Sequence, residues 1–287
     1  MRRKLTLRAI AVLLAISLIG VWILRPADSV GPCVLVSGPA MLPEVPEASG
    51  LAIGRRTPGV IWSHNDSGNE AVLFAIDPTG GAVRGRVRVS VRTGDWEDVS
   101  AGACPAGDCL YVADVGDNER SRRRISIYRV PEPLPTDTEA RPSDVFSATY
   151  ADGQHNAESV FVIGDELFIV TKDRAGAVYR ARMSAPDSGQ LVLRRVGETG
   201  LAAATDAETS RDGRLVVVRT SHEVVLYRTE DVLDNRFVAH LRIPIDGLHE
   251  AQGEGVALDG PMLYLASEGR PWERAGRLLA LRCDVLR

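Results

Sequence analysis

Five segments of this chain open with a small or acidic residue that leads into an apolar stretch. In each segment a second apolar stretch and then a polar loop follow. The five segments lie at nearly equal intervals along the sequence, and such regular spacing constrains the fold more than any other feature. Their opening residues, Ser49, Glu97, Glu158, Asp206 and Glu254, are 48, 61, 48 and 48 positions apart.

Each repeat contains three or four short stretches rich in Val, Ile and Leu, which alternation and turn residues mark as strands. A strand-rich repeat of this length is typical of propeller blades. The sequence therefore predicts an all-β, five-bladed β-propeller over residues 31–287. Six blades are the alternative, if the proline-rich excess at residues 131–143 of the second repeat hides strands; its prolines favour a loop.

The last repeat lacks a fourth strand, because the chain ends soon after Cys283. The stretch Cys33–Ser37 resembles a strand and belongs to no repeat. We expect it to supply the missing outer strand and so to close the ring without a free edge.

The four cysteines suit an oxidising compartment, where an even number suggests disulfides. Cys104 and Cys109 flank a short turn and could form a small loop. A bridge between Cys33 and Cys283 would join adjacent strands at the closure of the ring. The alternative is that Cys33 and Cys283 are buried free thiols.

The N-terminus is typical of an export segment. Basic residues precede the apolar run 9–24, and Arg25-Pro26 follows it. We expect residues 1–30 to form a hydrophobic helix, either a cleaved signal peptide or a transmembrane anchor, which makes the protein extracytoplasmic and either secreted or membrane-anchored. The net charge of −4 becomes more negative without this segment, which argues against nucleic-acid binding.

The first strand of each blade of a propeller lines the central channel, so the five opening residues should meet near the axis. Several carboxylates in one channel repel each other and need compensation. Oxygen ligands without His or Cys suit Ca²⁺. We therefore expect an axial Ca²⁺ site formed by Ser49, Glu97, Glu158, Asp206 and Glu254. Thr205 is the alternative to Asp206, since a shift of one residue exchanges the faces of a strand.

These motifs resemble those of two groups of propellers. Asp95-Trp-Glu-Asp98, His155-Asn-Ala-Glu158 and Gln252-Gly-Glu-Gly255 resemble inner strands of five-bladed propellers of the calcium-activated nucleotidase (apyrase) type. That resemblance implies a Ca²⁺ on the axis, bound by a serine, glutamates and a hydroxyl. The phrases around Asp95, Asp114 and His155 also resemble exported bacterial propellers, some of them phytase-like or esterase-like.

Polar loops between the second and third strands should lie at the same end of the channel as the five opening residues. Basic side chains in these loops could hold a phosphate or carboxylate. A histidine beside the metal could act as general base, with Asp66 to orient it. The candidates for such chemistry are His64, Asp66, His155, Lys172 and Arg219.

Two functions are compatible with these patterns. The first is an exported binding or scaffold module with an axial Ca²⁺, whose partner is a small anionic molecule or a protein. The alternative is a Ca²⁺-dependent hydrolase of phosphorylated or ester substrates. The N-terminal segment would add contact with a membrane if it is not cleaved.

Overall fold

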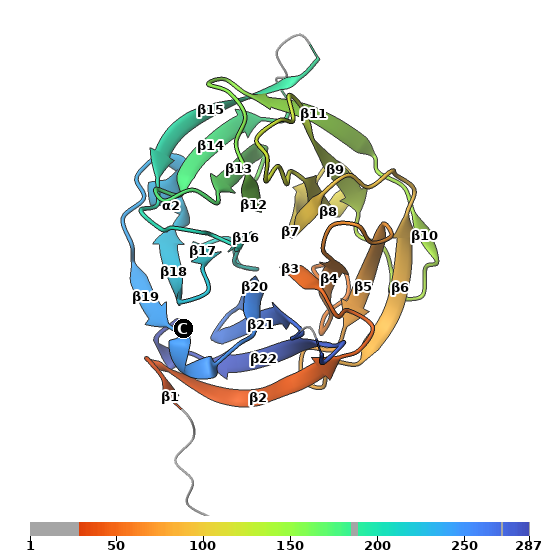
Figure 1. Cartoon of the computed structure of the whole chain (residues 1–287), viewed down its shortest axis with the longest axis vertical. Helices are drawn as coiled ribbons and strands as arrows, with labels where there is room; N and C mark the ends of the chain where they lie inside the picture. The colour runs from red at the N-terminus through yellow and green to blue at the C-terminus, as the bar shows by residue number, and fades with distance from the viewer. Residues whose placement is uncertain (1–28, 185–188, 271, 287) are drawn as a thin grey trace, which may run out of the picture.

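The computed structural model describes residues 29–184, 189–270 and 272–286 of the chain. These residues form an all-β, propeller-like fold in which twisted sheets stand around a common centre (Figure 1). The predicted N-terminal helix of residues 1–30, with the signal peptide or anchor, lies outside the described residues except at Ser29 and Val30, where the structure has the strand β1 (Ser29–Val30) in place of helix.

Five inner strands lie nearest the centre of the molecule (Figure 1). Each of them contacts the next in a closed circuit, and the last contacts the first. In order around the circuit they are β3 (Ala48–Ile53), β7 (Trp96–Cys104), β12 (Ala157–Ile163), β16 (Asp206–Thr209) and β20 (Gln252–Asp259).

Three sheets run outward from β3, β16 and β20. In each of them, strands that follow one another in the sequence pair as neighbours, before any more distant strand is added at the outer edge. The first sheet continues through β4 (Ile61–Asn65), β5 (Val72–Ile76), β6 (Val83–Val89) and β10 (Glu139–Ala140). The second continues through β17 (Leu215–Arg219), β18 (Glu223–Arg228) and β19 (Leu241–Pro244). The third continues through β21 (Met262–Glu268), β22 (Gly276–Arg282), β2 (Cys33–Leu42) and β1 (Ser29–Val30).

The fourth sheet has eight strands and departs from the prediction of separate four-stranded sheets. One antiparallel half runs outward from β7 and the other from β12, and the two outer strands pair in parallel, with Ala148 opposite Leu191. An outer strand has unpaired N–H and C=O groups, which explains why two neighbouring outer strands join. The halves are completed by β8 (Gly107–Asp114), β9 (Ile125–Pro131), β11 (Asp144–Tyr150), β13 (Glu166–Thr171), β14 (Ala177–Arg182) and β15 (Leu191–Glu198).

The proline-rich stretch 131–143 was predicted to be a loop, and this is wrong at Pro131, where a strand from Ile125 ends, and at the pair Glu139 and Ala140. These two residues form β10, which pairs in parallel with the outer edge of β6. The prediction missed the strand because the unpaired edge of β6, and not the local sequence, stabilises it. The stretch adds to an existing sheet and forms no sheet of its own.

The core fills the spaces between neighbouring sheets. One buried cluster packs Val217 and Leu226 of the sheet that begins at β16 against Val256 and Leu265 of the next sheet. Burial of each such side chain contributes roughly 1.5–3 kcal/mol to folding. The helical segments are short: α2 (Thr229–Leu233), η1 (Asp246–Leu248) and η2 (Asp284–Leu286).

The N-terminal strand completes the last sheet, as the sequence predicted. Strand β2 pairs antiparallel with β22, with Val34 opposite Arg282. The disulfides Cys33–Cys283 and Cys104–Cys109 are both present, which confirms the predicted pairing and excludes free thiols at Cys33 and Cys283. Two disulfides indicate an oxidising, extracytoplasmic environment. Over the described ranges, none of the helices has the length and apolarity to span a membrane.

The two disulfides should differ in their contribution to stability. Cys33–Cys283 joins residues 250 positions apart and Cys104–Cys109 residues 5 apart. The loop-entropy relation gives about 5.5 kcal/mol for the long loop and about 2 kcal/mol for the short one. Equilibrium unfolding in guanidinium should therefore show a much larger loss for Cys33→Ser/Cys283→Ser than for Cys104→Ser/Cys109→Ser. Equal losses would contradict the view that the long bridge restrains the whole ring.

Candidate metal centre

An irregularity at the start of three inner strands determines where their glutamates point. The pairing register shifts between Trp96 and Asp98, between Ala157 and Ser159, and between Gly253 and Gly255. The residue skipped in each case is a glutamate: Glu97, Glu158 or Glu254. A bulge of this kind redirects a side chain and is common beside functional sites.

The residues at equivalent positions form a ring around the channel, which we call the inner ring. Glu97, Glu158, Thr205 and Glu254 are each 6% exposed, and Ser49 is 3% exposed. The Ser49 hydroxyl donates a hydrogen bond to the Glu97 carbonyl oxygen at 2.7 Å, which joins two neighbouring members. Ser49 and Glu97 therefore lie side by side, and the charge of Glu158 acts on Glu97 as that of Glu254 acts on Glu158.

Asp206 is aligned with Asp98 and not with the glutamates. It is completely buried, and its Oδ2 accepts hydrogen bonds from the backbone N–H groups of Leu51, at 3.1 Å, and Val256. Strand β16 therefore holds β3 and β20 through this one carboxylate. The sequence predicted Asp206 for the inner ring, with Thr205 as the alternative, and the alignment of Asp206 with Asp98 favours Thr205.

Two further buried carboxyl groups connect the remaining inner strands. Asp98 Oδ2 accepts a hydrogen bond from the Val160 N–H at 2.6 Å, which ties β7 to β12. Glu208 accepts hydrogen bonds from the Ser100 hydroxyl and from the Ala101 N–H, which ties β16 to β7. Burial and the neighbouring charge of Asp206 raise the pKa of Asp98 well above its usual range.

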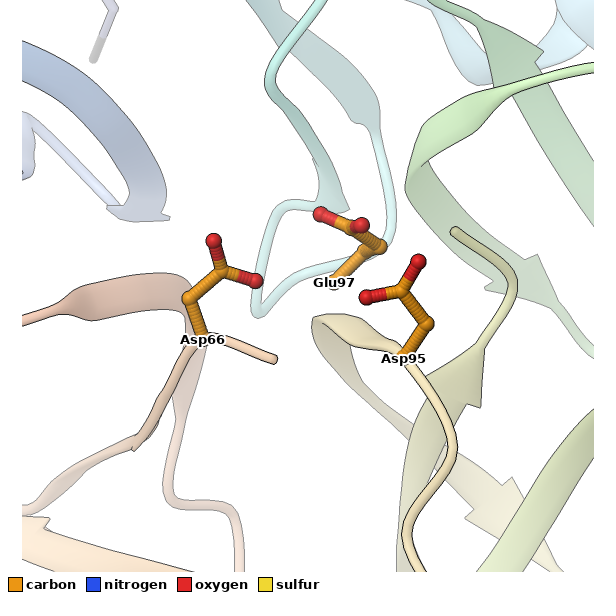
Figure 2. Close-up of side chains that lie close together, drawn as sticks. All are labelled: Asp66, Asp95 and Glu97. Atoms are coloured by element: carbon orange, nitrogen blue, oxygen red, sulfur yellow. The ribbon is translucent and has the colours of Figure 1, made fainter. Parts of the chain in front are cut away.

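Three carboxylates gather at the mouth of the channel, and we call them the acidic cluster. They are Asp66 in the loop after β4, Asp95 immediately before β7, and Glu97 on β7 (Figure 2). One oxygen atom of each lies within 4.8 Å of the others. Gly116 packs closely against two of these carboxylates, since a Cβ there would lie 2.1 Å from an oxygen of Glu97 and 2.3 Å from an oxygen of Asp95.

The accumulation of acids changes their protonation. Burial, with the charges of Asp66, Glu158 and Asp95, raises the pKa of Glu97 to about 10. Burial, with the charge of Glu254, raises the pKa of Glu158 and of nearby Glu268 to about 7. These three glutamates therefore hold their protons to higher pH than exposed glutamates do.

Lys172 supplies a positive charge to this region. It is the only lysine among the described residues, and its ammonium group pairs with Glu158. Burial disfavours the charged ammonium group, but the contact with Glu158 and the charges of Glu254 and Glu97 raise its pKa. Lys172 thus remains charged and offsets part of the acidic excess.

His64 occupies a different environment from the one predicted for a general base. The side chain is completely buried, and its Nδ1 lies 2.9 Å from the Asn65 carbonyl oxygen, while Nε2 has no hydrogen-bond partner. Its ring lies edge-on to Trp96 with centroids 5.7 Å apart. Burial lowers the pKa of His64 to about 4, so the imidazole is neutral at physiological pH.

His155 and Arg219 complete the predicted set. His155 Nε2 lies 3.1 Å from Asp152 Oδ1 and 2.8 Å from the Tyr179 hydroxyl, in a partly exposed group beside β12. Arg219 is completely buried: its Nη1 donates to the carbonyl oxygens of Gly255 and Ala266, and its Nη2 donates to Glu250. The guanidinium group thus joins two sheets from a buried position, whereas the sequence suggested a place in the polar loops.

The sequence analysis missed Asp95 as a site residue. Its signal was present, because Asp95 stands two positions before Glu97 in the motif Asp95-Trp-Glu-Asp98. Asp66 was predicted only as a partner of a histidine, and the structure places it with Glu97 and Asp95. The spacing of the inner strands could not predict the positions of Asp66 and Asp95, because both residues lie in loops.

Compared with known proteins, the chain matches no family model and no curated protein. Among solved structures it is similar to the major Malassezia sympodialis allergen Mala s 1, with 12% identity over 88% of this chain and 96% of that chain and a TM-score of 0.54. A chain of a nidogen–laminin complex gives a TM-score of 0.47 at 12% identity, over 77% of this chain and 72% of that chain. At such identity the likeness to Mala s 1 bears on the fold alone, and it agrees with a propeller-like all-β architecture.

The burial of His64 predicts a loss of stability in mild acid. The pKa of about 4 in the folded protein is below the value of 6.5 in the unfolded chain, so the unfolded state binds more protons as the pH falls through this interval. At pH 5 this difference costs about 2 kcal/mol relative to pH 8. The unfolding free energy of the wild type should fall by this amount more between pH 8 and pH 5 than that of His64→Gln. If the variant loses as much stability between pH 8 and pH 5 as the wild type does, groups other than His64 cause the loss.

Proposed function

We propose that this protein is an exported five-bladed propeller that binds Ca²⁺ at the mouth of its channel and acts as a binding module. The count of five treats the two antiparallel halves of the eight-stranded sheet as separate blades. Support comes from the closed circuit of five inner strands and from the five core clusters, each of which lies between neighbouring strand groups.

The observation that carries the proposal is the convergence of Asp66, Asp95 and Glu97 on one small space. Two like charges about 4 Å apart repel by roughly 4 kcal/mol at an effective dielectric constant near 20. A divalent cation removes this repulsion, and Ca²⁺ prefers six to eight oxygen ligands. The donor set consists of oxygen atoms alone, as a hard cation requires.

Further features fit a cation at this position. The Thr205 hydroxyl on the inner ring is buried and has no hydrogen-bond partner. Gly116 lets the backbone approach the carboxylates of Glu97 and Asp95, because a Cβ there would collide with both. Lys172 already places a positive charge on Glu158, as a substitute for a metal would.

The residues that would hold the ion come from two sets. Glu97 belongs to both, with Asp66 and Asp95 in the acidic cluster and with Ser49, Glu158, Thr205 and Glu254 in the inner ring. One oxygen of Asp206 accepts hydrogen bonds from two backbone amides, but its other oxygen and the Thr205 hydroxyl both lack a hydrogen-bond partner, so both residues are candidates at that position. When bound, Ca²⁺ would supply positive charge and open coordination positions at the mouth.

A partner would dock on the loop face around the mouth. Acidic side chains predominate there, so a small anionic ligand would need the bound cation, with Lys172, for its attraction. A protein partner could reach the same loops. The module is favoured over an enzyme because His64 and Arg219, two of the candidates for chemistry, are completely buried.

The alternative is a Ca²⁺-dependent hydrolase of phosphorylated or ester substrates. One observation favours it: His155 lies beside Asp152 in a pair that could accept a proton from water. Calcium-dependent turnover of a nucleotide, phosphate ester or aryl ester that is lost in His155→Ala would establish the hydrolase. If none of these substrates is turned over, the hydrolase is excluded for these classes and the binding module remains the proposed function.

Calcium should stabilise the protein through Glu97. A ligand at a hundred times its Kd adds about 2.7 kcal/mol to the unfolding free energy, so the melting temperature should rise with Ca²⁺ and fall with chelator. Calorimetric titration should give an affinity that Glu97→Gln weakens about tenfold or more. Glu230→Gln, at an exposed glutamate of α2, is the matched control and should bind as the wild type does. An affinity unchanged by Glu97→Gln would place any bound calcium elsewhere.

Lys172 should compete with the cation. Replacing Lys172 with Gln removes a charge that repels Ca²⁺ and frees the Glu158 carboxylate, so affinity should increase about tenfold at low salt. Arg174→Gln, in the same loop, is the control and should change the affinity much less. A weaker affinity in Lys172→Gln would mean that the ammonium group supports the site and does not compete for it.

A further inference from the structure

A second cavity lies away from the channel mouth, between the loop that follows β19 and the last sheet. Its volume is about 620 Å³, which is within the range of small-molecule sites. Leu35, Pro244, Leu248 and Leu279 form much of its apolar wall. None of the residues of the acidic cluster lines it.

Three polar residues also line this cavity, and each has a buried atom without a hydrogen-bond partner. The atoms are Glu250 Oε1, Ser267 Oγ and Arg277 Nε. Such atoms are rare in folded proteins, and each costs about 1–3 kcal/mol when it stays unpaired. An occupant of the cavity that reaches these three atoms would complete their hydrogen bonds.

The charges of these residues are already compensated within the protein. The other carboxylate oxygen of Glu250 pairs with Arg219, and Arg277 Nη2 contacts both carboxylate oxygens of Glu273, at 2.8 and 2.7 Å. An occupant therefore needs no net charge. It needs a donor for Glu250, an acceptor for Arg277 and either one for Ser267, because a hydroxyl both donates and accepts.

We propose that this cavity binds an uncharged amide that carries an aliphatic group. The amide N–H donates to Glu250 Oε1, the carbonyl oxygen accepts from Arg277 Nε, and the aliphatic group packs against Leu248 and Leu279. An amide matches the polar atoms because it carries both a donor and an acceptor. The aliphatic group matches the apolar wall, where its burial favours binding.

The site is separate from the proposed calcium centre, and its test needs no metal. N-acetyl-leucinamide is the probe, titrated by calorimetry into the full-length protein in the presence of chelator. We expect saturable binding, which Ser267→Ala weakens about fivefold, the loss of one hydrogen bond. Ser143→Ala, at a serine before β11 on another sheet, should bind the probe as the wild type does.

Stability provides a second measurement. Ser267→Ala removes a buried hydroxyl that has no protein partner, so the free variant should be at least as stable as the wild type. The N-acetyl-leucine anion should bind more weakly than the amide, because its carboxylate lies near Glu250 and Glu273. No binding of the amide, equal binding by Ser267→Ala, or tighter binding of the anion would each overturn the proposal, as would a crystal structure soaked in the probe that shows only water in the cavity.

Discussion

Three buried carboxyl groups hold the centre of this molecule together. Asp206 connects β16 to β3 and β20, Glu208 connects β16 to β7, and Asp98 connects β7 to β12. All five inner strands are therefore linked through acceptors that satisfy backbone amides, which are costly to bury unpaired. Gly50 leaves the space for Asp98, since a Cβ there would lie 2.6 Å from its carboxylate.

The same arrangement creates an electrostatic cost. Strands that carry acids at their first residues bring those acids together when the ring forms, and the loops add Asp66 and Asp95. Protonation of Glu97 and the ammonium group of Lys172 offset part of the repulsion. Our proposal assigns the remaining compensation to Ca²⁺, so that one feature explains both the acidic inner ring and the irregular strands that form it.

The sequence predicted more of the fold than of the site. The period and the alternation of apolar residues identify the strands, and the lone stretch at Cys33 predicts the pairing of β2 with β22. The parallel contacts of β10 and β11 could not be predicted, because they depend on which outer edges meet in space. The position of Thr205 depends on a shift of one residue, which no local pattern decides, and the burial of His64 and Arg219 depends on neighbouring sheets.

Diffraction from crystals grown with Mn²⁺ tests the central claim most directly, since Mn²⁺ accepts the same oxygen ligands as Ca²⁺ and scatters anomalously. We predict one strong anomalous peak at the channel mouth, within bonding distance of Glu97, that disappears when excess Ca²⁺ is added. The account would be contradicted if no anomalous peak appeared at the channel mouth in crystals where Asp66, Asp95 and Glu97 keep the arrangement described above.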